Sequence, residues 1–159
     1  MKITFLIIDM QQIYLKEIAG IPKACEHINY VASLLRNKNH TVIHIKDMEG
    51  ADEHNEASYQ IISEIEINEK DVMVSKIYSN AFWKTDLEKI ISENKTELLI
   101  LSGFAAENCV LATYNGAKER GFTTVILQNG ILSNHEDVIT QTYRDRNIIS
   151  YPVIEALTK

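Results

Sequence analysis

A cysteine at the junction between a strand-like run and a helix-like stretch is the residue best placed to do chemistry. Cys109 comes shortly after the apolar run 98–101 and precedes a helical pattern that reaches Arg120. The first amides of a helix are unpaired and carry the positive end of its dipole, which favours a thiolate, the nucleophilic form of cysteine. A small buried core residue is the competing interpretation, and this segment alone does not separate the two.

Two charged residues also follow strand-like runs directly. Asp9 comes after residues 5–8, and Lys76 comes after residues 72–75. Ligands of open parallel sheets bind beyond the carboxyl ends of the strands, so we expect both side chains to lie near Cys109. There the carboxylate can take the thiol proton while the ammonium stabilises the anion formed. Taken singly, Asp9 could be a cap and Lys76 a surface charge, but their common position favours a catalytic set.

Short β-branched runs alternate with longer helical patterns along the whole chain. This alternation predicts an α/β fold, a doubly wound and mostly parallel six-stranded sheet with helices on both faces. The predicted strands are residues 3–8, 41–45, 71–75, 97–101, 123–127 and 147–150. The predicted helices begin near residue 22, span 58–65, extend from 85 to 91 and from 107 to 120, and begin again near 134. Residues 46–57 read as a polar loop that borders the site.

Composition and charge narrow the class of protein. The 159 residues, 45% of them hydrophobic, predict a single domain over residues 1–159. A net charge of -6 without a basic cluster argues against nucleic-acid binding. The N-terminal apolar run is too short for a signal peptide or a membrane span, so we expect a cytoplasmic protein without a membrane partner. In that compartment Cys25 and Cys109 are expected to be reduced.

Three blocks of sequence resemble the isochorismatase-like cysteine hydrolases, the nicotinamidase/isochorismatase superfamily. They are LIIDMQ at residues 6–11, KIYSNAF at 76–82 and GFAAENCV at 103–110. The blocks occur in the family's order through nearly the whole chain, and together they are specific. The resemblance implies a Rossmann-like three-layer sandwich and the hydrolysis of a small amide, ureide or related C–N bond.

The resemblance also implies a role for each residue of the site. Asp9 would be the general base, Lys76 would stabilise the thiolate and the acyl transition state, and Cys109 would form a thioester acyl-enzyme. Backbone amides of Ala105 and Cys109 would form the oxyanion hole, after a cis peptide bond between Phe104 and Ala105. Helix-start amides aimed at a developing oxyanion stabilise it strongly.

Three aromatic residues are expected to wall a small-molecule substrate. Tyr14 stands shortly after the aspartate, and Phe82 and Trp83 follow the lysine block. Core packing is the competing interpretation, strongest for Phe82 and weakest for Tyr14. The chain is short for the family, which implies a homo-oligomer, a dimer or tetramer, in which neighbouring subunits cover the site.

The sequence departs from the family pattern at several positions. Asn80 replaces a usual serine and Glu107 a usual aspartate, which weakens a subfamily assignment without touching the nucleophile. The Asp-x-His and His cluster that holds a metal in nicotinamidases is not reproduced. Asp47, Asp52 and His54 lie in the corresponding loop with different spacing, and a solvated acidic loop explains them better. We therefore predict no metal and no other cofactor.

Two other functions stay open at this stage. One is vinyl-ether hydrolysis of the isochorismatase type, in which the cysteine is dispensable and Asp9 acts as an acid. The other is a catalytically silent binding or interaction protein, because a fold alone does not secure a function. The intact set of Asp9, Lys76 and Cys109 favours the amide hydrolase.

Overall fold

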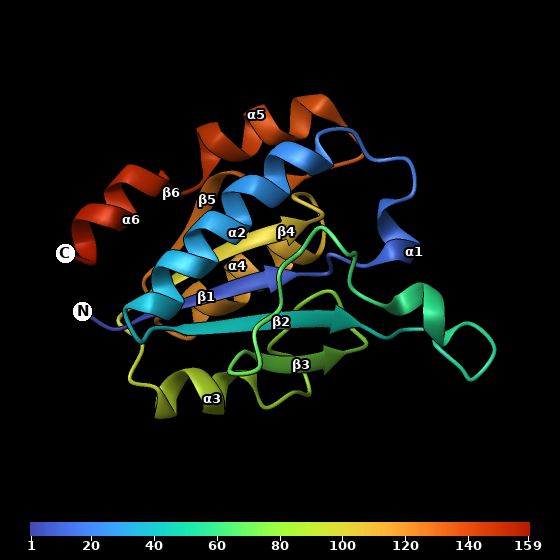
Figure 1. Ribbon diagram of the computed structural model, residues 1–159, viewed down its shortest axis with the longest axis horizontal. Coiled ribbons are helices and arrows are strands. Elements are labelled where there is room, and N and C mark those ends of the chain that lie inside the picture. The colour runs from blue at the N-terminus through green and yellow to red at the C-terminus, as the bar shows by residue number, and fades with distance from the viewer.

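A six-stranded parallel sheet forms the middle layer of the computed structural model, which describes residues 1–159 (Figure 1). The strands are β1 (Ile3–Ile8), β2 (Thr41–Asp47), β3 (Val72–Lys76), β4 (Leu98–Phe104), β5 (Thr124–Leu132) and β6 (Ile148–Ile149). Their order is β3-β2-β1-β4-β5-β6, and every neighbouring pair is parallel. The winding direction reverses between β1 and β4, where open α/β sheets bind their ligands.

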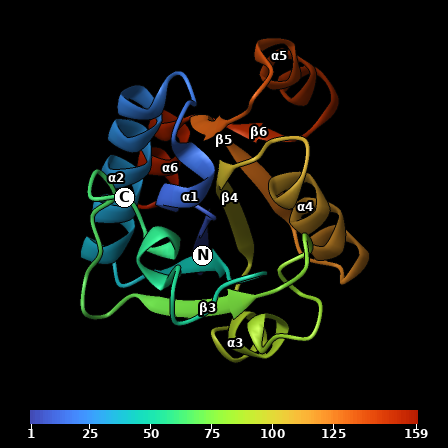
Figure 2. The ribbon, with the colours of Figure 1, turned by 90° about the vertical axis from the view of Figure 1, so that its right-hand side faces the viewer.

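Helices cover both faces of this sheet, which confirms the predicted doubly wound α/β fold. They are α1 (Gln12–Leu15), α2 (Ile21–Asn37), the 3-10 helix η1 (Glu56–Tyr59), α3 (Leu87–Glu93), α4 (Cys109–Glu119), α5 (Glu136–Asp145) and α6 (Tyr151–Leu157). Helices α2 and α6 pack on one face, and α3, α4 and α5 pack on the other (Figure 2). No helix is both long enough and apolar enough to span a membrane.

Strand β1 lies at the centre of the molecule and is buried along its whole length. Its side chains alternate between the two faces, so that Phe5 and Ile7 join the core beneath α2 while Leu6 and Ile8 join the core beneath α3 and α4. An apolar strand buried on both faces is typical of a parallel sheet. Cys25 is likewise buried in α2, as a core residue of its apolar stripe.

The segment between β2 and β3 differs from the sequence-based prediction. The helix predicted over residues 58–65 is wrong, because η1 ends at Tyr59 and residues 60–71, which lead on to β3, contain no helix. Ile62 and Ile65 are nevertheless buried in the core beneath α2, and the Ile62 amide donates to the Met10 carbonyl at 2.9 Å. The two isoleucines therefore fix a non-helical segment to the core and do not form one face of a helix.

Candidate active site

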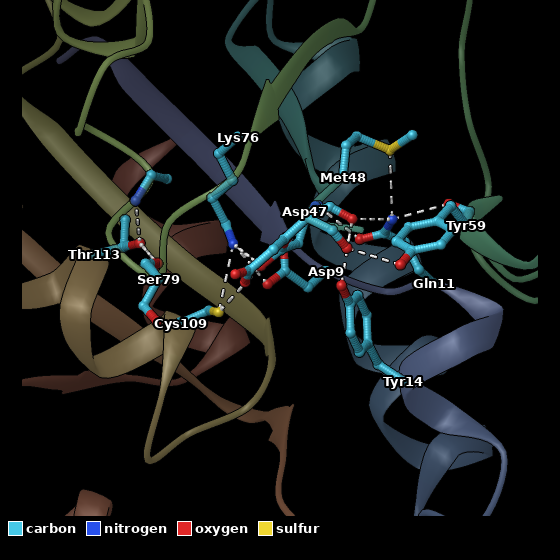
Figure 3. Close-up of polar contacts among 12 residues, drawn as sticks. Asp9, Gln11, Tyr14, Asp47, Met48, Tyr59, Lys76, Ser79, Cys109 and Thr113 are labelled. Carbon is cyan, nitrogen blue, oxygen red and sulfur yellow. Dashed lines mark hydrogen bonds and ion pairs between the residues drawn. The ribbon is translucent and has the colours of Figure 1, made fainter. Parts of the chain in front are cut away.

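Asp9, Lys76 and Cys109 meet at the carboxyl end of the sheet, as the sequence predicts (Figure 3). Asp9 follows β1 directly, Lys76 is the last residue of β3, and Cys109 is the first residue of α4. The Lys76 Nζ lies 3.0 Å from the Asp9 Oδ2 and 3.4 Å from the Cys109 Sγ. The lysine ammonium therefore bridges the carboxylate and the thiol.

The backbone of Asp9 turns sharply where β1 ends. Its φ of 52° is left-handed, a conformation that aspartate tolerates better than most residues. The Asp9 amide donates to the Ile45 carbonyl at 3.0 Å, and the Asp9 carbonyl accepts from the Gln11 amide at 2.8 Å. These bonds hold the carboxyl group in the interior, where Asp9 is only 2% exposed and its Oδ1 has no hydrogen-bond partner.

Asp47 is a fourth member of the site and its third charged side chain, and the sequence pattern does not assign it there. It is the last residue of β2 and pairs in register with Lys76. Its Oδ2 lies 2.8 Å from the Lys76 Nζ and 4.0 Å from the Cys109 Sγ. The sequence pattern predicts that this strand ends at residue 45 and so places Asp47 in the polar loop. The observed β2 is two residues longer, which puts Asp47 at the same edge of the sheet as Asp9 and Lys76.

Gln11 fixes the position of Asp47. Its buried Oε1 accepts from the Asp47 amide at 2.8 Å, while its Nε2 donates to the Asp47 carbonyl at 3.0 Å and to the Tyr59 carbonyl at 2.9 Å. The side chain thus ties the end of β2 and helix η1 to the turn after β1. The glutamine of the LIIDMQ block positions an acid rather than approaching Cys109.

The loop before Cys109 presents two free backbone amides. Gly103 has a φ of 107°, and a Cβ there would lie 2.1 Å from the Ile8 carbonyl oxygen, so β4 needs glycine at this close approach. The peptide bond between Phe104 and Ala105 is cis, as the resemblance implies. The Ala105 amide donates to no backbone carbonyl, and Cys109 opens its helix without an intrahelical acceptor.

A cavity of about 200 Å³ opens beside the thiol. It is lined by Asp9, Tyr14, Asp47, Ser79, Phe104, Ala105, Asn108 and Cys109. The Tyr14 hydroxyl donates to the Asp47 carbonyl at 3.4 Å and so faces the site.

The structure does not bring Phe82 and Trp83 to this cavity. Phe82 is buried in the core and stacks on Phe122 with ring centroids 6.0 Å apart, whereas Trp83 is 52% exposed. The Ala81 amide donates to the Thr113 hydroxyl of α4 at 3.0 Å, which pins the loop with Phe82 turned inward. Core packing, the competing interpretation, therefore describes Phe82.

Burial governs the protonation of the site. It raises the pKa of Asp9 to about 6 against the opposing effect of Lys76. Burial, with the negative charge of Asp9, raises the pKa of Cys109 to about 12. The pKa of Lys76 is lowered by burial but raised more by its acidic neighbours, and ends above its ordinary value. The resting site therefore holds a protonated thiol beside a carboxylate, rather than the thiolate that the helix terminus alone favours.

The ligand atoms of Asp9, Asp47 and Cys109 lie within 4.8 Å of one another, close enough for a metal ion. The ammonium of Lys76 already contacts all three of these residues. A second cation would have to displace this ammonium or share its ligands with it. Asp52 and His54 are exposed and do not line the cavity.

Known proteins resemble this chain in sequence. The family model for the isochorismatase domain matches residues 4–145. An uncharacterised isochorismatase family protein of Bacillus subtilis, YddQ, is 25% identical over 138 residues, which cover 81% of this chain and 77% of that protein. A maleamate amidohydrolase of Pseudomonas putida is 27% identical over 67 residues, 42% of this chain and 32% of that enzyme.

Solved structures share the fold. An isochorismatase-like hydrolase from Alkaliphilus metalliredigens superposes with a TM-score of 0.86 at 18% identity, covering 100% of both chains. An N-carbamoylsarcosine amidase from Thermoplasma acidophilum gives a TM-score of 0.81 at 18% identity, over 94% of this chain and 95% of the amidase. With the family match spanning most of its length, the chain belongs to the isochorismatase family of hydrolases.

Proposed function

We propose that the protein hydrolyses a small carboxamide, ureide or related C–N bond through a thioester on Cys109. The observation that carries this proposal is the single lysine ammonium that contacts both a buried carboxylate and a thiol, 3.0 Å and 3.4 Å away. A nucleophile, a base and a stabilising cation in contact are the components of covalent acyl transfer. The small cavity beside them leaves room for a compact substrate.

The first half-reaction begins with proton transfer. Asp9 takes the proton of Cys109, and the Sγ electron pair attacks the carbonyl carbon of the substrate. The free amides of Ala105 and Cys109 donate hydrogen bonds to the carbonyl oxygen and stabilise the negative charge that develops on it. When the tetrahedral intermediate collapses, the C–N bond breaks, Asp9 gives its proton to the nitrogen, and ammonia or an amine leaves.

The second half-reaction hydrolyses the thioester. Asp9, again a carboxylate, takes a proton from a water molecule whose oxygen attacks the thioester carbonyl. The C–S bond breaks, the sulfur regains a proton, and a carboxylic or carbamic acid is released. Lys76 stays protonated throughout, because its pKa is raised, and it stabilises the negative charge wherever that charge resides.

The relatives support a C–N hydrolase over the vinyl-ether alternative. Both a maleamate amidohydrolase and an N-carbamoylsarcosine amidase occur among the similar proteins. In a vinyl-ether hydrolase the cysteine would be dispensable, whereas here Cys109 contacts Lys76 and lines the cavity. The proposal therefore assigns the thiol a covalent role.

The test is a screen of small carboxamides and ureides for ammonia release, with intact-protein mass spectrometry during turnover. We expect the wild-type protein to gain the mass of the acyl group, and Cys109→Ala to lose activity by at least about a thousandfold. Cys25→Ala is the matched control, since it removes the other thiol, which lies in the core beneath α2. Undiminished hydrolysis by Cys109→Ala would refute the thioester and favour vinyl-ether chemistry.

A further inference from the structure

We propose that the substrate of this site is a small amide without negative charge, and that Asp47 is the residue that excludes anionic amides. The inference rests on the proposed function and narrows its substrate class. It comes from the way Lys76 is surrounded and from what lines the cavity.

The ammonium of Lys76 has no donor left for a substrate. An ammonium offers three hydrogens. In the structure its Nζ lies 3.0 Å from the Asp9 Oδ2, 2.8 Å from the Asp47 Oδ2 and 3.4 Å from the Cys109 Sγ. Three partners match three donors. A carboxylate on the substrate could bind Lys76 only by displacing one of these partners.

The charges around the cavity sum to a negative value. Two carboxylates, Asp9 and Asp47, face one ammonium, and all three side chains are at most one-tenth exposed. The residues that line the cavity include no lysine, arginine or histidine. Ser79 and Asn108 contribute only neutral polar groups. A negative charge on the substrate would be repelled by this net negative charge, and no unpaired cation is there to bind it.

Among the side chains of the site, one buried polar atom lacks a partner, and it is an acceptor; the free amides of Ala105 and Cys109 are assigned to the carbonyl oxygen of the substrate. The Oδ1 of Asp9 is buried and receives no hydrogen bond. The NH₂ of a carboxamide or ureide would supply the missing donor, whereas a carboxylate has none to give. The cavity of about 200 Å³ is smaller than common ligand pockets of roughly 300–1,000 Å³, so the remainder of the substrate must be compact.

The first test compares two alkylating agents that differ in charge. Iodoacetamide is neutral and iodoacetate is anionic, yet both react at the same carbon. The quantity measured is the rate constant with iodoacetamide divided by that with iodoacetate. We expect this ratio to be at least about tenfold larger for Cys109 than for 2-mercaptoethanol under the same conditions, because only Cys109 lies beside carboxylates whose charge is not fully neutralised. An equal preference, or faster reaction with iodoacetate, would overturn the proposal.

Asp47→Asn should bring the preference of Cys109 close to that of 2-mercaptoethanol. Asparagine keeps the backbone contacts of residue 47 with Gln11 and the Oδ1 that accepts from the Glu49 amide. It removes the charged Oδ2 that pairs with Lys76. Ser79→Ala changes a neutral cavity residue and should retain the full preference. A preference that survives in Asp47→Asn would refute the role of Asp47.

The second test measures hydrolysis of maleamide and of maleamate, which share a skeleton and differ by one charge. We expect kcat/KM to be at least about tenfold higher for maleamide, and the gap to narrow in Asp47→Asn. Faster hydrolysis of maleamate would overturn the substrate class and leave the amide hydrolase intact. Charge-selective alkylation with no hydrolysis of either compound or of any carboxamide or ureide in the screen would refute the proposed function while supporting the exclusion of anions by Asp47.

Discussion

In the proposed mechanism the reaction starts when Asp9 takes the proton of Cys109. Burial disfavours charge on either group, and the structure places one negative charge, on Asp9, against the ammonium of Lys76. The thiol stays protonated at rest, so its reaction with an electrophile needs a base that takes the proton. A substrate carbonyl beside free amides is what makes transfer to Asp9 productive.

Holding Asp9 ionised in the interior costs stability, and the cost depends on pH. Because its pKa is raised from 3.8 to about 6 on folding, the folded protein binds the proton more tightly than the unfolded chain. The contribution of Asp9 to the free energy of unfolding is therefore fully present below pH 3.8 and is lost as the pH rises through about 6. We expect Asp9→Asn to be more stable than wild type at pH 8, by on the order of 3 kcal/mol.

Urea unfolding at pH 8 and at pH 4 measures this difference. The advantage of Asp9→Asn should shrink as the pH falls, because the wild-type carboxyl becomes protonated in both states. Asp52→Asn, a change at an exposed loop aspartate, is the control and should show no such dependence. An equal stability difference at both pH values would contradict the assignment of a burial penalty to Asp9.

The ends of the strands position the residues of the site, and β4 approaches β1 closely at Gly103, where only glycine fits. At Gly103 the backbone has a left-handed φ, and a Cβ would lie 2.1 Å from the Ile8 carbonyl oxygen. We expect Gly103→Ala to lower the free energy of unfolding by about 3 kcal/mol or more, since the two central strands would have to separate. Chemical denaturation measures the loss.

Gly121, after α4, is the matched control. It also has a positive φ, but a Cβ there would meet nothing within 4 Å. Gly121→Ala should therefore cost only the conformational strain of about 1–2 kcal/mol. If the two alanine variants were equally destabilised, close packing of β4 on β1 would not be the reason for glycine at position 103.

The fold could be predicted because its strands are short, apolar and β-branched, and because their alternation with helices has few solutions. The positions of Asp9, Lys76 and Cys109 followed from the same pattern, since each comes where a strand ends or a helix begins. Asp47 could not be found this way. Lys46 and Asp47 are polar residues that continue β2 beyond its apolar run, so hydrophobicity marks the end of that strand too early.

The helix predicted over residues 58–65 is wrong for a different reason. Its apolar spacing suggests a helix, but Ile62 and Ile65 each anchor a non-helical segment in the core beneath α2, and these tertiary contacts override the local pattern. Phe82 shows the same limit at a single position. A residue next to the lysine block is equally placed for substrate or core, and tertiary contacts decide between them: the hydrogen bond from Ala81 to Thr113 and the stacking of Phe82 on Phe122.

The surface of the whole molecule includes an apolar patch in the loop that follows the site lysine. Ile77, Tyr78 and Trp83 follow Lys76 in the chain and are 40% to 54% exposed. Exposed apolar groups concentrated in one segment are typical of protein contacts. We propose that this loop contributes to a homo-oligomer, a dimer or tetramer.

Sedimentation equilibrium would then give a mass of two or four chains of 18.1 kDa each. Trp83→Ser should weaken the association, whereas Ile67→Ser, a change at another exposed apolar residue outside this loop, should not. A mass of one chain at micromolar concentration would contradict the proposed oligomer.

The coupling of Asp9 to Cys109 is tested most directly by the pH dependence of Cys109 alkylation by iodoacetamide, followed peptide by peptide with Cys25 as the internal comparison. The account predicts a rate that rises through pH about 6, as Asp9 becomes able to accept the thiol proton, and then levels off. In Asp9→Asn this plateau should disappear and the rise should move to higher pH. A single rise near pH ~8.5, the same in both proteins, would show an ordinary thiol and contradict the catalytic set.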